Sequence, residues 1–238
     1  MSPAADRVQR EVVSFVRRSA RMNASQQRAW DSLQHWIVPV PARVMSTSIA
    51  ADAVVDWPAV FGRRAPLIVE IGGGTGHAIA AHAAAHPEVD HVVFEVHQPS
   101  VASTLSRLQR AGVDNVRVVL ANGVEGLERL FGEGSLAEVW TFFPDPWHKA
   151  RHHKRRLVTP EFAGLVASRL APGGTWRLAT DWAEYADWML AVLDEEPRLA
   201  NPHPGFSPRW DGRPSTKFEA KGLAAGREVF DITYRRIG

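Results

Sequence analysis

The 238-residue sequence predicts an α/β fold in which a mostly parallel central sheet is covered by helices on both faces. Two observations support this fold. From residue 67 onward, short apolar runs of strand type alternate with helical segments, a pattern typical of parallel sheets. Glycines, acids and an amide follow several of these runs directly. Ligands of parallel sheets bind at the carboxyl ends of the strands, so these residues mark the expected binding edge.

The expected strands are short and apolar, as the buried strands of parallel sheets are. Leu67-Ile68-Val69-Glu70-Ile71 is the clearest of them, and it leads directly into a glycine-rich turn. The six expected strands cover residues 67–71, 89–95, 116–120, 136–141, 175–179 and 229–234.

The expected helices are placed by their capping residues and by proline and glycine. Asn23 or Ser25 is a candidate N-cap for the first helix. Pro172-Gly173-Gly174 predicts a turn between a helix and the strand that follows it. The expected helices cover about residues 26–36, 77–85, 99–111, 124–130, 160–170 and 181–195.

Residues 1–50 are expected to form a basic N-terminal extension, and residues 51–238 the α/β domain. Within the first 40 residues, six arginines outnumber three acidic residues, and Pro39 and Pro41 end the segment. Two interpretations of this segment remain open, since the sequence shows no groove-reading motif. It is either an ordinary solvated helix with an arginine-rich face or a second RNA contact.

The composition excludes several classes of site. The chain has no cysteine, which excludes disulfides, thiolate metal sites and a cysteine nucleophile. Its N-terminus lacks the apolar core of a signal peptide, and no apolar run approaches the length of a membrane span. We therefore expect a cytoplasmic protein. His82 and His86 are four residues apart on an expected helix, but no third ligand is evident, so no metal is expected.

The glycine-rich turn has the spacing of a nucleotide-cofactor site. Glu70, Gly72, Gly74 and Gly76 form the pattern E-x-G-x-G-x-G. A dinucleotide-binding G-x-G-x-x-G that starts at Gly72 requires a glycine at position 77, where this chain has histidine. The turn therefore resembles motif I of S-adenosylmethionine-dependent methyltransferases more than a nicotinamide site.

Two further polar residues follow expected strands. Glu95 ends the second strand, where a carboxylate binds the ribose hydroxyls of a cofactor. Asn122 follows the third strand and precedes Gly123. Its amide oxygen could accept a hydrogen bond from an adenine amino group, or the residue could simply form a turn; both interpretations stay open.

Asp145 lies in a restrained aromatic segment, Phe142-Phe143-Pro144-Asp145-Pro146-Trp147, directly after the fourth strand. Each proline fixes its own φ and moves the residue before it away from the helical region. The backbone of Asp145 is therefore expected to be extended and ordered in advance, which favours a catalytic role.

A block of positive charge follows this segment. Residues 149–156 hold five Lys or Arg residues and two histidines, a composition that suits a phosphate backbone. A solvated basic loop is the alternative. Because the block is joined to the Asp145 segment in the middle of the domain, we favour a nucleic-acid site.

Six short stretches carry a family pattern. They are Glu70-Ile71-Gly72, Glu95-Val96-His97, Phe142–Lys149, Arg151–Arg156, Ala179-Thr180-Asp181-Trp182 and Thr216-Lys217-Phe218-Glu219. Together they resemble the bacterial tRNA (guanine-N7-)-methyltransferases, from the Arg21-Met22 region nearly to the C-terminus. The Asp145–Arg156 block is highly specific, whereas the glycine turn alone is not. The sequence departs from the family at Asn122, where the family often has aspartate, and at Gly73 and Thr75.

The resemblance implies a Rossmann-like class I methyltransferase fold and S-adenosyl-L-methionine as the cofactor. It implies methyl transfer to N7 of a variable-loop guanosine in tRNA. We expect tRNA as the partner, with no membrane and no obligate protein partner.

The resemblance also implies roles for individual residues, with Asp145 as the catalytic residue and no metal. The implied cofactor-binding residues are Glu70, Gly72, Gly74, Gly76, Glu95, Asn122 and Asp145. The implied substrate contacts are Lys149, Asp181, Thr216, Lys217, Phe218 and Glu219. The implied RNA-binding residues are Arg151, His152, His153, Lys154, Arg155 and Arg156.

Asp181 and Glu219 are the acids that could accept hydrogen bonds from N1 and N2 of guanine. The alternatives are a helix N-cap at Asp181 and a surface acid at Glu219. Guanine N7 carries no proton at neutral pH, so its methylation needs no general base. Asp145 is therefore expected to position the base and to stabilise the positive charge that develops on it.

Three other functions fit parts of the sequence. A methyltransferase that acts on an exocyclic amine is the nearest, because an Asp-Pro-aromatic segment after the fourth strand also suits that acceptor. An RNA-binding module that keeps a nucleotide fold without turnover is the second. A nicotinamide-dependent dehydrogenase is the third, and His77 and the basic block disfavour it.

Overall fold

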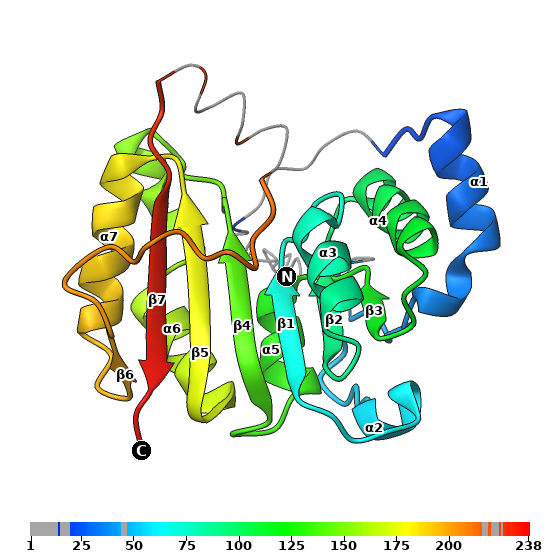
Figure 1. Ribbon diagram of the computed structural model, residues 1–238, viewed down its shortest axis with the longest axis horizontal. Helices are drawn as coiled ribbons and strands as arrows, with labels where there is room; N and C mark the ends of the chain where they lie inside the picture. Colours follow the sequence, from blue (N-terminus) through cyan, green and yellow to red (C-terminus); the bar gives the residue numbers. More distant parts are fainter. Residues whose placement is uncertain (1–13, 15–19, 44–46, 216–218, 220–223, 225) are drawn as a thin grey trace, which may run out of the picture.

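A twisted sheet forms the centre of the computed structural model, which describes residues 14, 20–43, 47–215, 219, 224 and 226–238 (Figure 1). Within this part of the chain the sheet has seven strands in the order β3-β2-β1-β4-β5-β7-β6. The strands are β1 (Leu67–Ile71), β2 (Asp90–Phe94), β3 (Val116–Val119), β4 (Leu136–Phe142), β5 (Leu170–Thr180), β6 (Leu199–Ala200) and β7 (Phe230–Arg236).

Strands β1 to β5 pair in parallel, whereas β7 runs antiparallel to both β5 and β6. The chain order reverses at β1, since β2 and β3 lie on one side of it and β4 and β5 on the other. Sheets of this kind bind ligands at the carboxyl ends of the strands beside such a reversal. This topology confirms the expected mostly parallel sheet and directs attention to the ends of β1 and β4.

Helices cover both faces of the sheet, as expected. The helices are α1 (Ala24–Ser32), α2 (Trp57–Phe61), α3 (His77–Ala85), α4 (Gln98–Ala111), α5 (Gly123–Leu130), α6 (Pro160–Arg169) and α7 (Ala183–Asp194). One apolar cluster joins α1, α3 and α4 to one face, and a larger cluster joins α5, α6 and α7 to the other. The two layers can be followed in Figure 1.

Alternation within β1 explains how one strand serves both layers. Val69 and Ile71 belong to the cluster on the α5 side, and Ile68 belongs to the cluster on the α3 side. Successive side chains of a strand point to opposite faces, so a strand buried on both faces is apolar throughout. Glu70 is the one charged residue of this strand, and it too is buried.

The first helix is shorter than predicted. Asn23, not Ser25, caps α1 in a reciprocal pair of hydrogen bonds with Gln26. The helix ends where Leu33 leaves helical geometry (φ −117°, ψ 30°), and a short 3-10 helix, η1 (Gln34–Trp36), follows. The predicted helix over residues 26–36 is therefore two elements.

The fifth strand is longer than predicted, because the turn at Pro172-Gly173-Gly174 lies inside β5 as an irregularity. Pairing with β4 jumps from Leu136 with Leu170 to Glu138 with Thr175. Gly174 is packed against three backbone oxygens, where a Cβ atom would approach to 2.8–3.1 Å. Three short elements were not predicted at all: α2, β6 and a 3-10 helix η2 (Ala150–Arg155).

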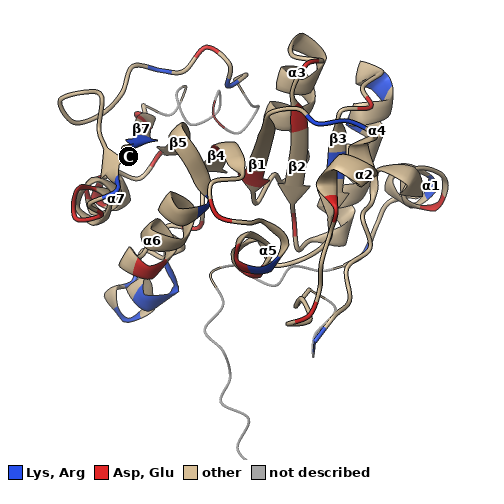
Figure 2. Cartoon of the chain, turned by 90° about the horizontal axis from the view of Figure 1, so that it is seen from below, with Lys and Arg blue, Asp and Glu red and all other residues tan. Residues whose placement is uncertain are grey.

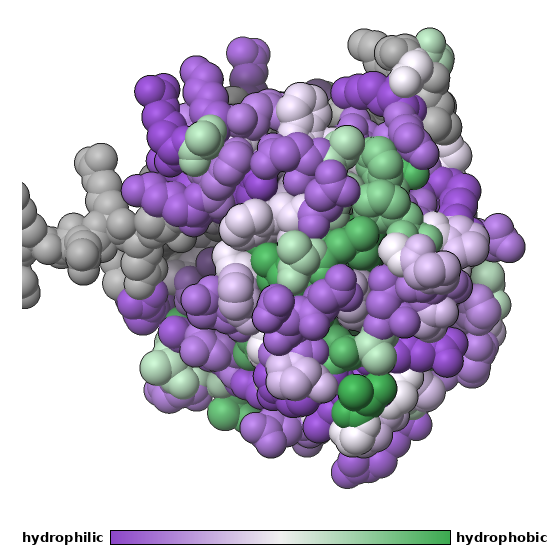
Figure 3. All heavy atoms as spheres, turned by 90° about the vertical axis from the view of Figure 1, so that its left-hand side faces the viewer, coloured by the Kyte–Doolittle hydropathy of each residue, from purple (hydrophilic) through white to green (hydrophobic). Residues whose placement is uncertain are grey.

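The described residues before position 51, which were predicted to form an N-terminal extension, pack against the sheet and its helices. Helix α1 lies along α4, and Gln26 donates a hydrogen bond to the carbonyl of Pro99 (3.0 Å). Ile37 forms a parallel bridge with Val118 at the β3 edge. Among the described residues, every helix is too short or too polar to cross a membrane. The α7 side of the molecule is mostly hydrophilic, with a band of hydrophobic side chains across it (Figure 3).

Candidate functional site

The glycine turn between β1 and α3 has a backbone that only glycine adopts readily. Gly72, Gly74 and Gly76 have φ values of +76°, +56° and +73°, a region that L side chains rarely occupy. These are the three glycines of the predicted E-x-G-x-G-x-G spacing. An added Cβ at Gly72 or Gly74 would meet nothing within 4 Å, so the turn is open on that side to a ligand.

The other side of the turn is tightly packed. An added Cβ at Gly73 would lie 2.2 Å from Cγ2 of Val93, and one at Gly76 would lie 2.6 Å from the side chain of Thr104 on α4. The backbone N–H groups of Gly72 and Gly73 donate to the carbonyl of Phe94 (2.9 and 3.2 Å). Gly73, at which the sequence departs from the family, is therefore required by close packing against β2.

Glu95 lies directly after β2 and is fixed beside the turn. Its Oε2 accepts a hydrogen bond from the backbone N–H of Gly74 (2.8 Å). Its Oε1 accepts from the N–H groups of Val96 and His97 (2.7 and 2.8 Å). Oε1 thus uses both of its lone pairs, whereas Oε2 keeps one for a further donor, so this side chain is already held in place to accept a hydrogen bond from a ribose hydroxyl.

Glu70 is buried under the turn, 4% exposed. Burial, followed by the nearby charge of Glu95, raises the pKa of its carboxyl to about 8. Its Oε2 atom has no hydrogen-bond partner among the described residues, which is costly for a buried polar atom. A cationic ligand in the turn would supply the missing partner.

Asn122 has the local structural role that was the alternative to an adenine contact. It is the N-cap of α5, and its Oδ1 accepts from the backbone N–H of Val124 (3.1 Å). Its own N–H donates to the carbonyl of Thr47 (2.7 Å). The side-chain oxygen keeps a second lone pair, so an adenine contact at Asn122 stays a prediction.

Asp145 is half-buried at the centre of a strained loop after β4. Phe143 and Trp147, two residues before and after it, have φ values of +52° and +49°. Each such conformation costs a bulky L residue about 1–3 kcal/mol. The N–H of Phe143 donates to the carbonyl of Ala179 on β5 (2.7 Å), which holds the first end of the loop.

The basic block forms the 3-10 helix η2 beside the Asp145 loop and α6, where Lys and Arg gather in Figure 2. Desolvation and the positive charge of four neighbouring cations lower the pKa of His152. The ring of Trp147 contacts this helix through His152 (centroids 5.9 Å apart) and the guanidinium of Arg155 (4.9 Å). The exposed cations of the basic block are Lys149, which precedes η2, and Arg151, Lys154 and Arg155 within it.

Arg156 was predicted to contact RNA, but the structure places its side chain in the protein interior. Its side chain is 0% exposed and forms an ion pair with Glu184 of α7 (2.8 Å). Its Nε donates to the carbonyl of Pro146 (3.1 Å). The guanidinium is thus enclosed by protein, so it does not face a phosphate.

The predicted guanine contacts have different environments. Asp181, after β5, pairs with Arg227 (3.1 Å) and does not cap α7, whose N-cap is Trp182. Glu219 is buried in an ion pair with Arg209 and lies 2.9 Å from Nη1 of Arg213.

Glu219 was predicted to accept hydrogen bonds from guanine. In the structure its carboxylate is instead enclosed by Arg209 and Arg213. Arg213 also pairs with Asp231 (2.8 Å). The remaining predicted contacts, Thr216, Lys217 and Phe218, lie outside the described residues.

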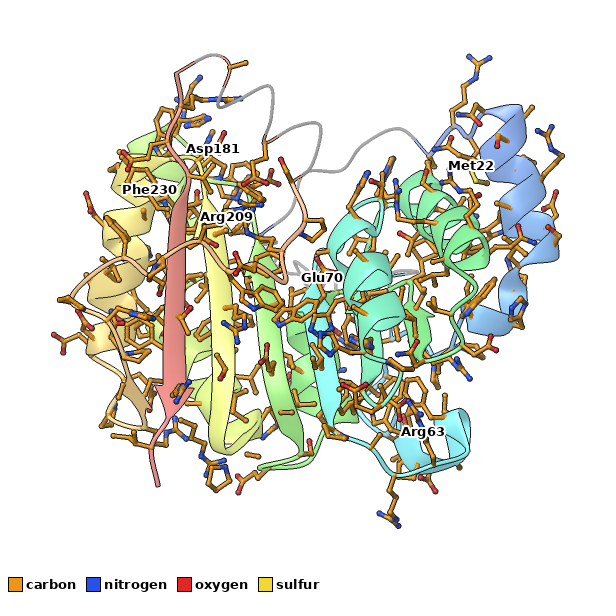
Figure 4. All side chains as sticks on the ribbon, in the orientation of Figure 1. Met22, Arg63, Glu70, Asp181, Arg209 and Phe230 are labelled. Atoms are coloured by element: carbon orange, nitrogen blue, oxygen red, sulfur yellow. The ribbon has the colours of Figure 1, made fainter. Side chains whose placement is uncertain are left out.

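The structure brings most predicted site residues to one edge of the sheet. Glu70, Glu95 and Asn122 lie at or after the ends of β1, β2 and β3, and Asp145 and Asp181 follow β4 and β5. In Figure 4, Glu70 and Asp181 lie nearer to this edge of the sheet, whereas Arg63 lies at the opposite end.

The cavity of about 450 Å³ at that opposite end, lined by Trp57, Arg63 and Phe131, lies away from the glycine turn and the Asp145 loop. We assign the site by the polar groups that converge on the carboxyl edge, not by cavity volume.

Two contributors could not be recognised from the sequence. Thr104 packs under Gly76 and donates to the carbonyl of Gly74 (3.2 Å), and Arg107 donates to the carbonyl of Thr75 (3.0 Å). Both residues lie on α4, three positions apart, and together they hold the glycine turn in place. The sequence of α4 shows only ordinary amphipathic spacing, so it does not reveal this role. His82, considered as a metal ligand, is instead buried against His91 (Nδ1 to Nε2, 2.9 Å).

Comparison with known proteins identifies the family. A family model described as "Putative methyltransferase" matches residues 64–232. A tRNA (guanine-N(7)-)-methyltransferase of Cutibacterium acnes is 58% identical over 237 residues, which are 98% of this chain and 86% of the relative. One from a Nocardioides species is 52% identical over 235 residues, 96% of this chain and 89% of the relative.

Solved structures show the same fold at low identity. The 16S rRNA methyltransferase KamB matches with a TM-score of 0.54 and 13% identity, over 77% of this chain and 93% of that chain. The likeness confirms the Rossmann-like methyltransferase fold.

Proposed function

This chain belongs to the tRNA (guanine-N(7)-)-methyltransferase family, and on that premise we propose that it methylates N7 of a variable-loop guanosine in tRNA, with Asp145 at the reacting atoms. S-Adenosylmethionine is the methyl donor. The observation that carries the proposal is the strained loop that holds Asp145 after β4, beside the glycine turn after β1. Since tRNA is the substrate, we place the activity in the cytoplasm.

The residues of the turn fit the cofactor. The open side of Gly72 and Gly74 leaves room for it against the backbone. Glu95 is oriented for the ribose hydroxyls, and the unpartnered Oε2 of Glu70 suits a positively charged methionine amino group. When bound, S-adenosylmethionine supplies a methyl group on a positively charged sulfur. We assign Asn122, at the end of β3, to the adenine.

Asp145 acts through charge and position. The N7 atom of guanine has a free lone pair at neutral pH, so no residue has to remove a proton before transfer. The purine ring becomes positively charged as it accepts the methyl group. A carboxylate fixed beside the ring stabilises that charge, and a fixed charge is most effective where it needs no reorganisation during the reaction.

The exposed cations of η2 lie next to this loop and give the tRNA backbone a place to bind. Lys149 begins this surface, and Trp147 joins it to Asp145. Asp181 lies after the neighbouring strand β5, where it can accept hydrogen bonds from guanine if tRNA displaces Arg227.

Transfer of a labelled methyl group from S-adenosylmethionine to bulk tRNA tests the proposal directly. The product nucleosides should contain 7-methylguanosine and should lack labelled exocyclic amines. Label on an amino group would instead support the rival amine methyltransferase. Binding of tRNA with no transfer would support an RNA-binding module without turnover.

A further inference from the structure

Arg155 and Arg156 are adjacent in the basic block, yet they occupy opposite environments. Arg155 is exposed, and its guanidinium lies 4.9 Å from the ring of Trp147. Arg156 has a side chain with 0% exposure. Only the first of these two arginines is therefore placed to meet a phosphate, and the second requires another explanation.

The guanidinium of Arg156 joins three segments. It donates from Nε to the carbonyl of Pro146, the residue after Asp145 (3.1 Å). It donates from Nη2 to Glu184 on α7 (2.8 Å), and the same nitrogen lies 3.1 Å from Nε2 of His153 in η2. Through one side chain, the Asp145 loop, the basic helix and α7 are tied together.

Helix α7 makes further contacts with Arg156 and with Val158, which follows it. The guanidinium of Arg156 lies 4.9 Å from the ring of Tyr185 and 5.6 Å from that of Trp188. The Tyr185 hydroxyl accepts from the N–H of Val158, and the Trp188 indole donates to the carbonyl of Val158 (3.2 and 2.8 Å). The segment that leaves η2 is thus held against the first turns of α7.

The Asp145 loop needs such a restraint. Its two left-handed residues, Phe143 and Trp147, store strain that persists only where the surroundings hold the backbone. At the first end, β5 supplies a backbone hydrogen bond to Phe143. At the second end, the carbonyl of Pro146, next to Trp147, is held by Arg156.

Stability alone does not account for this arginine. Its Nη1 atom is buried without a hydrogen-bond partner among the described residues, and buried ion pairs are often no better for stability than apolar residues of similar size. Its partner Glu184 is 56% exposed, and the hydrogen bond from Arg156 lowers the pKa of the Glu184 carboxyl.

We propose that Arg156 is a positioning residue that makes no phosphate contact. It fixes the Asp145 loop relative to α7 and to η2. This inference rests on the proposed function, because it assumes that Asp145 acts at the reacting atoms. A loop that shifts by about 1 Å can lose on the order of 100-fold in rate. The effect of Arg156 should therefore fall on methyl transfer and not on tRNA binding.

Three substitutions separate the two roles. Arg156→Lys keeps the charge but cannot donate to Pro146 and Glu184 with the same fork geometry. Arg156→Met removes the charge and keeps most of the buried volume. Glu184→Gln removes the negative charge of the ion pair at its exposed partner and leaves Arg156 itself unchanged. Arg155→Ala is the matched control, and thermal unfolding checks that every variant is folded.

Single-turnover transfer with both ligands saturating should slow by roughly 10- to 100-fold in Arg156→Lys and Glu184→Gln. The salt dependence of tRNA binding is the slope of the logarithm of the binding constant against the logarithm of the salt concentration. This slope should stay unchanged in Arg156→Met and should become shallower by about 0.7–0.9 in Arg155→Ala. Wild-type transfer by Arg156→Lys, together with a flattened slope in Arg156→Met, would overturn the inference. A wild-type enzyme without transfer to tRNA would overturn the proposed function instead.

Discussion

The carboxylate of Glu95 accepts a hydrogen bond from the backbone N–H of Gly74, 21 residues earlier in the chain, at 2.8 Å. This hydrogen bond joins the end of β2 to the glycine turn after β1. The two parts of the predicted cofactor site therefore form one unit before any ligand binds. A site that is ordered in advance loses less entropy on binding.

Replacing Glu95 with alanine should weaken the binding of S-adenosylmethionine by about 1.5–3 kcal/mol, the range for a hydrogen bond to a charged group. Titration calorimetry measures this change. Glu88→Ala is the control, because Glu88 is an exposed acid that pairs with His86. Binding of nicotinamide adenine dinucleotide by the wild type, without binding of S-adenosylmethionine, would contradict the cofactor assignment.

Gly73→Ala should disrupt the turn by steric overlap, since the new Cβ would lie 2.2 Å from Cγ2 of Val93. Overpacking of this kind typically costs about 1–3 kcal/mol. Cofactor affinity should fall, and the double variant Gly73→Ala with Val93→Ala should recover part of it. If the second substitution restores nothing, the packing explanation of Gly73 is wrong.

The order of strands and helices was predictable because each apolar run and each cap acts locally. The glycine turn was predictable too, since its positive φ values demand glycine at the spaced positions. The short elements were not, because α2 has five residues and β6 has two, too few for any periodicity. Their formation depends on tertiary packing.

The inward orientation of Arg156 could not be predicted from the sequence. Two neighbouring arginines look equivalent in a basic block, and only the 3-10 geometry of η2 and the position of α7 decide which one is buried. Glu219 is similar, because its partners Arg209 and Arg213 precede it in the same connection between β6 and β7, and residue type alone does not show that they pair. In both residues an ion pair formed on folding determines the role, and residue type does not reveal it.

The stability of the cofactor-free protein should depend on Glu70. Burial raises the pKa of its carboxyl from 4.5 to about 8. Between these two pH values the folded state keeps a proton that the unfolded state has released. The free energy of unfolding should therefore fall as the pH rises from about 4.5 to about 8.

The variant Glu70→Gln should lack this fall, so its stability relative to the wild type should increase with pH. The expected change is about 1.4 kcal/mol for each pH unit across the window at most. Urea unfolding at several pH values without cofactor measures it. Parallel curves for the two proteins would show that Glu70 does not keep its proton in the folded state.

The exposed cations of η2 should set the salt dependence of tRNA binding. In the triple variant Arg151→Ala, Lys154→Ala, Arg155→Ala, the slope should decrease by roughly 0.7–0.9 for each phosphate that the variant no longer neutralises. Cofactor affinity should not change. Arg64→Ala, an exposed arginine at the opposite end of the sheet, is the control. An unaltered slope in the triple variant would make η2 an ordinary solvated helix.

The most direct test of the role of Asp145 is the single-turnover rate of Asp145→Asn with cofactor and tRNA saturating. Asparagine keeps the shape and removes the charge, so transfer should slow by roughly 10²–10³-fold, as on loss of one electrostatic stabiliser. Calorimetry should first confirm that the variant is saturated with cofactor, since Asp145 is also expected to touch it. A rate within a few-fold of the wild type would contradict the assignment of Asp145 as the charge-stabilising residue.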